Sequence, residues 1–161
     1  MTPYDAYKFA HAAHADQKDK SGAPYINHVV RVTLKAQEYA ARVADRWFRD
    51  DVTVAALLHD VVEDTPVTFE DLVMMINPNV LAILQLVTRD TSTGETYQQW
   101  IQTLCASRNY GAIIVKLADN FDNSLPERLA TLPEAERSIE KRYLKARVFL
   151  QTAYDYHSRL P

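Results

Sequence analysis

The chain has 161 residues, a length typical of one domain with a single hydrophobic core. Hydrophobic residues make up 47% of it, which excludes a disordered chain, and only three residues are glycine, which argues against a hairpin-rich β-protein. The net charge of −3 excludes a large basic field, so we expect neither nucleic acid nor an anionic membrane as a partner.

Cysteine content and hydropathy predict the cellular compartment of the protein. The single cysteine, Cys105, excludes a disulfide within the chain and fits a reducing compartment. We expect it to be a small buried hydrophobe rather than a catalytic thiol. No apolar run approaches the roughly 20 residues that a membrane span needs, and the first residues are too polar for a signal peptide. We therefore expect a cytoplasmic protein.

Helix signals follow one another along the chain. Thr2 and Pro3 predict a first helix start, Pro24 a second, and the third helix begins after Asp50 or Asp51 and is stopped by Pro66. The helices are expected, in chain order, over residues 3–14, 24–34, 52–64, 69–76, 79–87, 95–107, 112–122 and about 133–156.

The segment 112–122 is apolar enough to form a buried strand. We interpret it as a helix because its polar residues recur three and four positions apart: Lys116, Asp119, Asn120 and Asn123. Nothing in the chain alternates convincingly with period two. The prediction is a single all-α domain over residues 1–161, a bundle of about six to eight helices.

Ionisable side chains end two otherwise apolar helices. His59 and Asp60 lie at the end of one, and Asp119 at the end of another. A buried carboxylate needs a cation or hydrogen bonds, so we expect both helices to meet at a shared metal ion, with His28 as a second imidazole. This mixed set of nitrogen and oxygen ligands suits Mn²⁺, Fe²⁺, Zn²⁺ or Mg²⁺.

Two further carboxylates share the face of the expected ligands. Glu63 lies four residues after His59, and Asp64 four residues after Asp60, so each pair projects from one side of a helix. A metal-bound water is a nucleophile at neutral pH, and this acidic pair is placed to orient that water or to move protons. Taken singly, each residue could equally cap a helix, pair with a neighbour or face solvent; the combination favours the functional interpretation.

Three segments resemble the motifs of the RelA/SpoT-type alarmone hydrolase domains, which belong to the HD superfamily of phosphohydrolases. They are AHADQKDKSGAPYINH, AALLHDVVEDTPVTFEDL and IIVKLADNFDN, in the order and separation of the family, over roughly residues 5–125. The resemblance implies a helical HD-domain fold and Mn²⁺-dependent removal of the 3′-pyrophosphate from guanosine tetra- or pentaphosphate.

The resemblance also implies a role for each matching position. The metal ligands are His28, His59, Asp60 and Asp119, and the catalytic acidic pair is Glu63 and Asp64. The positions that line the nucleotide pocket are Lys20, Ser21, Tyr25 and Asn123. To these we add Lys116, and either it or Lys20 would compensate the charge of a substrate phosphate.

Three positions depart from the usual family residues. Asp19 and Asn120 stand where the family carries arginines, and Asp122 stands where it carries a histidine. The change at Asp19 reverses a charge and removes a flat cation that packs against the base. We therefore expect an altered base contact beside an intact metal site.

The segment 86–97, LVTRDTSTGETY, also differs from the usual family text. Its residues Arg89, Glu95 and Tyr97 either contact a different substrate, or simply pack against neighbouring residues and face solvent. Packing is the interpretation we prefer.

The expected function is hydrolysis of a small phosphorylated nucleotide, with an alarmone-like pyrophosphate as the first candidate substrate. A nucleotidase or phosphatase for another small metabolite is one alternative, and it would release orthophosphate rather than pyrophosphate. A non-catalytic nucleotide-binding module is another, and the pair Glu63 and Asp64 argues against it because pure binding needs no proton-transfer groups. The sequence leaves the formation of a homo-oligomer open.

Overall fold

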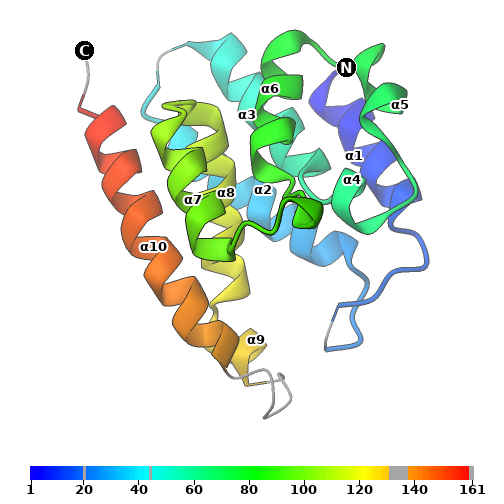
Figure 1. Cartoon of the computed structure of the whole chain (residues 1–161). Helices are drawn as coiled ribbons and strands as arrows, with labels where there is room; N and C mark the ends of the chain where they lie inside the picture. The colour runs from blue at the N-terminus through cyan, green and yellow to red at the C-terminus, as the bar shows by residue number, and fades with distance from the viewer. Residues whose placement is uncertain (20, 44, 131–137, 160–161) are drawn as a thin grey trace.

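The computed structural model describes residues 1–19, 21–43, 45–130 and 138–159, and these residues form a bundle of α-helices without a named strand (Figure 1). This confirms the all-α prediction. The elements are α1 (Pro3–Ala13), α2 (Ile26–Ala40), α3 (Arg46–Leu58), α4 (Val61–Asp64), α5 (Phe69–Val73), α6 (Pro78–Val87), the 3₁₀-helix η1 (Thr91–Thr93), α7 (Tyr97–Ala106), α8 (Tyr110–Asn123), α9 (Pro126–Leu129) and α10 (Ser138–His157).

Helix α8 is the centre of the bundle. It packs against α2, α3, α6 and α10, while α1 and α10 lie on opposite sides of the molecule (Figure 1). Asn109 caps α8 by accepting a hydrogen bond from the backbone N–H of Ala112 at 3.0 Å. A β-carbon at Gly111 would lie 2.5 Å from Ile83 Cδ1, so glycine permits the close approach of α6 and α8. Segment 112–122 is therefore a helix, as expected, rather than a strand.

The expected helix over 52–64 differs from the structure in two respects: the structure divides it into α3 and α4, and α3 begins earlier than expected. Helix α3 begins earlier, at Arg46, where Asp45 accepts a hydrogen bond from the backbone N–H of Trp47 at 2.9 Å. It ends before His59, and Asp60 has φ −105° and ψ −1°, in the bridge region of backbone conformations. The break changes the direction in which these two side chains point.

Other helix bounds follow local chemistry. The capping boxes that begin α1 and α5 form at Thr2 and Thr68. Pro24 does not open α2, because it forms an isolated β-bridge with Lys18 that closes the loop before the helix. The short helix α9 was not expected, and the predicted helix start near 133 lies outside the described residues.

Two further expectations concern the thiol and the membrane. Cys105 is partly buried, and burial raises its pKa to about 11, as suits an unreactive thiol. Within the described residues, no helix combines the length and the apolar character that crossing a membrane requires. The assignment of residues 1–161 to one domain stays a prediction.

Candidate functional site

Four side chains that are distant in sequence converge where α2, the α3–α4 break and α8 meet. His28 Nε2 lies 3.5 Å from Asp60 Oδ2 and 3.5 Å from Asp119 Oδ1. His59 Nε2 lies 2.9 Å from Asp60 Oδ2 and 3.8 Å from Asp119 Oδ1. Ligand atoms of His28, His59 and Asp60 all lie within 4.8 Å of one another. The structure thus places all four expected ligands around one centre.

The outer nitrogens of the two imidazoles are held by acceptors. His59 Nδ1 lies 2.9 Å from the carbonyl oxygen of Ala56, which can only accept, so this nitrogen donates. His28 Nδ1 lies 2.7 Å from Asp122 Oδ2. Both Nε2 atoms therefore face the centre, and His59 Nε2 is buried without a hydrogen-bond partner among the described residues. Two fixed imidazoles and two carboxylates are a donor set that fits a divalent metal ion.

The centre has a strongly negative potential. Burial opposes protonation of His59, but the carboxylates of Asp60 and Asp119 outweigh it and raise the pKa of His59 to about 9. The same balance raises the pKa of His28 well above its usual value. Burial alone would raise the pKa values of Asp60 and Asp119. The neighbouring cations outweigh burial and hold both pKa values well below the usual range. A potential that attracts protons to imidazoles also attracts a metal cation.

Asp122 contacts the candidate site, and the sequence analysis noted it only as a departure from the family. Its carboxylate accepts a hydrogen bond from Arg31 Nε at 2.6 Å and from Arg128 Nη1 at 2.9 Å, besides the contact with His28. Burial raises the pKa of Asp122, but these partners outweigh burial and hold it at about 2. A permanently charged acceptor therefore orients His28. The available signal was its position on α8, one turn beyond Asp119.

A pocket of about 440 Å³ opens beside the four converging residues. Glu63 and Asp64 line it and are exposed to it. Asp64 Oδ2 accepts a hydrogen bond from Gln17 Nε2 at 3.0 Å, and Glu63 Oε2 accepts one from the backbone N–H of Arg89 at 3.3 Å. Partial burial of its carboxylate raises the pKa of Glu63 above its usual value.

Three of the expected substrate contacts also hold the candidate ligands in place. The hydroxyl of Tyr25 donates to Asp60 Oδ2 at 2.5 Å. Lys116 Nζ lies 2.7 Å from Asp119 Oδ2, and Asn123 Nδ2 donates to Asp119 Oδ1. All three line the pocket, so each is placed to contact a substrate as well as to orient a carboxylate.

The loop before α2 contributes further residues to the pocket wall, among them Asp19 and Ser21. The carboxylate of Asp19 accepts hydrogen bonds from the backbone N–H of Ser21 at 2.9 Å, from its hydroxyl at 2.5 Å and from the backbone N–H of Ala23 at 3.0 Å. Asp19 therefore shapes this loop instead of presenting a flat cation. Lys20 lies outside the described residues.

The segment 86–97 contributes to the pocket unevenly. Arg89 and Tyr97 line its wall, whereas Glu95 does not. The Oε1 atom of Glu95 accepts a hydrogen bond from Thr103 Oγ1 at 3.0 Å, and its backbone carbonyl accepts one from Arg89. Packing therefore describes Glu95, while Arg89 and Tyr97 have access to whatever the pocket binds.

An all-helical domain with converging imidazoles and carboxylates defines a class of candidate metal-dependent enzymes. The profile of the HD-domain family matches residues 6–138, so the chain belongs to the HD-domain family. This confirms the family membership that the three motifs predict.

Among curated relatives, the Drosophila melanogaster guanosine-3′,5′-bis(diphosphate) 3′-pyrophosphohydrolase MESH1 is 37% identical over 123 residues, which cover 74% of this chain and 65% of that protein. An Aquifex aeolicus guanosine-3′,5′-bis(diphosphate) 3′-pyrophosphohydrolase is 33% identical over 124 residues, 73% of this chain and 16% of that protein. The chain thus spans less than two thirds of either relative.

The fold is also similar to a solved structure, described as that of a metazoan ortholog of SpoT that hydrolyzes ppGpp. The TM-score is 0.69 and the sequence identity 26%, and the match covers 98% of this chain and 96% of the other. The likeness therefore extends over nearly the whole of both chains.

Proposed function

We propose that the protein is a metal-dependent phosphohydrolase that removes the 3′-pyrophosphate from guanosine 3′,5′-bis(diphosphate). The observation that carries this proposal is the convergence of two imidazoles and two carboxylates beside a pocket lined by a second pair of carboxylates. The names of the relatives supply the substrate.

The proposed division of labour follows the contacts. His28, His59, Asp60 and Asp119 would hold the metal, which would supply Lewis-acid chemistry for activating water and a phosphoryl group. Glu63 holds or releases a proton at its carboxylate. Asp64, which accepts a hydrogen bond from Gln17, orients the attacking water. Lys116 lies in the pocket wall, where its charge would offset part of the negative charge of a phosphate.

Product analysis tests this proposal directly. Purified protein loaded with Mn²⁺ is incubated with guanosine 3′,5′-bis(diphosphate), and the products are separated by ion-exchange chromatography. Release of pyrophosphate supports the proposal. Release of orthophosphate would replace it with a phosphatase or nucleotidase, and binding of the nucleotide without any product would replace it with a regulatory module.

Metal binding is expected to release protons at pH 7, because a ligating imidazole must be neutral. The neighbouring carboxylates raise the pKa of His59 to about 9 and raise that of His28 as well, so the metal would displace protons from these rings. Titration calorimetry with Mn²⁺ in buffers of different ionisation enthalpy measures the number of protons released. The apparent affinity should rise as the pH increases toward 9; an affinity that is independent of pH would contradict this account.

The variant Asp122→Asn is expected to weaken Mn²⁺ binding about 10- to 100-fold, the usual effect of losing a partner that orients a ligating histidine. The amide keeps the shape of the side chain but removes the charge that fixes His28. Competition with a fluorescent chelator measures the dissociation constant. Asp155→Asn, a change on α10 away from the pocket, is the control and should leave it unchanged.

Three expectations remain predictions. Manganese as the native metal is tested by metal analysis of the protein purified without added metal. A cytoplasmic location is tested by cell fractionation. Self-association is tested by analytical ultracentrifugation.

A further inference from the structure

One wall of the pocket is made of alternating cations and aromatic rings, and it begins beside the candidate metal ligand Asp119. Lys116, which pairs with Asp119, has its Nζ 4.5 Å from the centre of the Trp100 ring. The Trp100 ring lies 5.5 Å from that of Tyr97 in an edge-on arrangement. The wall therefore leads away from the metal centre along α7.

The wall ends at an arginine on α10. The guanidinium of Arg142 lies 4.6 Å from the ring centre of Tyr97 and 5.5 Å from that of Tyr143, and all three residues line the pocket. Aromatic rings hold one face of a guanidinium by cation–π attraction and leave its N–H groups free to donate. Within the described part of the chain, no carboxylate forms an ion pair with Arg142.

The position of Arg142 is fixed from the core. Asn120, which is fully buried, donates a hydrogen bond from Nδ2 to the backbone carbonyl of Tyr143 at 3.1 Å. This ties α10 to α8 next to Arg142. Asn120 is one of the positions that depart from the usual family arginine, so the chain uses it to anchor the helix that carries a different arginine.

The cations of the pocket wall differ in their partners. On the loop before α2, Asp19 is engaged in hydrogen bonds with Ser21 and Ala23 and forms an ion pair with Arg128 at 3.9 Å. On α10, Arg142 presents a positive charge, and its N–H donors have no carboxylate partner within the described residues. A guanidinium with free donors is suited to bind a phosphate through paired hydrogen bonds.

We propose that Arg142, held against Tyr97 and Tyr143, is a binding site for a second phosphate group of the substrate, remote from the one that is hydrolysed. The proposal rests on the proposed function, because the first phosphate is taken to lie at the metal centre. It deepens that function by naming the residue that binds the second phosphate, so that the substrate would lie along the wall between the candidate metal centre and α10.

The test compares two nucleotides in the Mn²⁺-loaded protein. Guanosine 3′,5′-bis(diphosphate) carries the second group, and guanosine 3′-diphosphate, with a free 5′-hydroxyl, lacks it. We expect Arg142→Ala to raise the KM for the first nucleotide about 10- to 100-fold, the effect of losing charged hydrogen bonds. The KM for the second nucleotide and both kcat values should stay the same. Arg142→Lys should recover part of the affinity.

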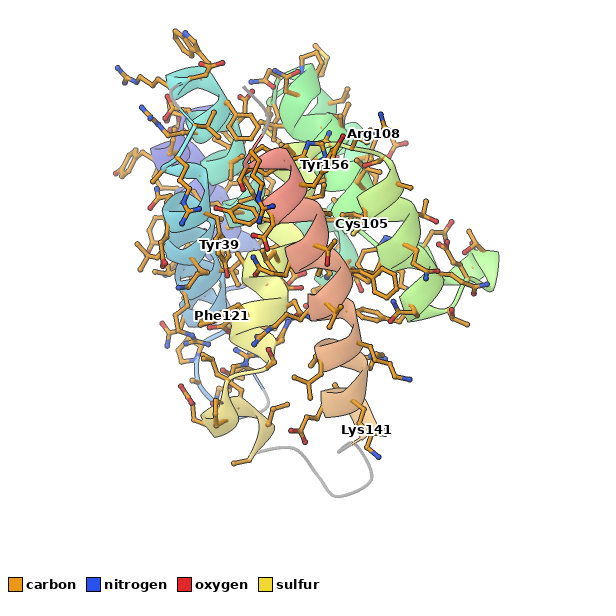
Figure 2. The ribbon with its side chains drawn as sticks, turned by 90° about the vertical axis from the view of Figure 1, so that its left-hand side faces the viewer. Tyr39, Cys105, Arg108, Phe121, Lys141 and Tyr156 are labelled. Carbon is orange, nitrogen blue, oxygen red and sulfur yellow. The ribbon has the colours of Figure 1, made fainter. Side chains whose placement is uncertain are left out.

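Lys141→Ala is the matched control, because Lys141 is an exposed cation near the start of the same helix (Figure 2) and does not line the pocket. It should leave both KM values unchanged. An equal rise of KM for both nucleotides in Arg142→Ala would mean that the guanidinium contacts the shared nucleoside, and no rise would mean that it contacts neither; each result overturns the proposal.

Failure of the proposed function gives a different result from failure of this proposal. If the wild-type protein hydrolyses neither nucleotide, the proposed function fails, and equilibrium binding of guanosine 3′,5′-bis(diphosphate) then decides the role of Arg142. Weaker binding by Arg142→Ala than by the wild type supports the second phosphate site. Equal binding, or no binding by either protein, overturns it.

Discussion

Replacing His59 with alanine is expected to remove the bound metal and to lower kcat/KM by about 10³-fold or more. The reason is that a catalytic metal lowers the activation barrier by several kcal/mol. His59 Nε2 is a buried atom that faces the other ligands, and Ala56 fixes the opposite side of its ring. Metal content by mass spectrometry and initial rates measure the two effects.

The matched control is His11→Ala, because His11 is exposed on α1 and does not line the pocket. His59 is a cleaner target than Asp119, whose removal would leave the buried Lys116 without its partner and cost about 3–5 kcal/mol of stability. A His59→Ala protein that folds, keeps a full complement of metal and turns over normally would rule out the assigned centre.

Replacing Glu63 with glutamine is expected to leave the metal in place and to lower kcat about 10²- to 10⁴-fold, the usual contribution of a proton-transferring group. The amide has the shape of the carboxylate but cannot exchange a proton in the same way. Glu63 is not among the converging ligand atoms, so metal content should equal that of the wild type. Steady-state rates together with metal analysis separate the two effects.

The pH dependence gives a second measurement on Glu63. Because burial raises its pKa, a carboxylate that must be ionised to accept a proton loses activity as the pH falls through a value above the ordinary glutamate range. That acidic limb should be absent in Glu63→Gln. The control is Glu70→Gln, an exposed position on α5, which should keep the rate and the limb. An unchanged kcat in Glu63→Gln would remove this residue from the mechanism.

The helices themselves could be predicted from the sequence because their signals are local. The hydroxyl of Thr2 accepts a backbone N–H group one turn ahead, as its position before Pro3 indicates. The division between α3 and α4 could not be predicted in this way. The residues around it favour a continuous helix, and the bridge-region conformation of Asp60 depends on contacts with Tyr25 and His28, which lie more than thirty positions earlier.

The candidate ligands could be predicted because charged groups in apolar helices are costly and therefore conspicuous. Their supports could not. The pairing of His28 with Asp122 spans 94 positions, and the contact of Tyr97 with Arg142 depends on how α7 packs against α10. Neither contact has a local signature, since a surface arginine on an amphipathic helix reads as a solvated residue until the partner helix is in place.

The candidate metal ligands come from three separate stretches of chain, so an unfolded polypeptide has no such site to offer. An ion that binds only the native state shifts the folding equilibrium toward it, by about 1.4 kcal/mol for each tenfold rise in free metal above the dissociation constant. Metal supply would then govern how long each molecule survives as well as how fast it works. A cell short of the ion would lose the protein to proteolysis as well as its turnover.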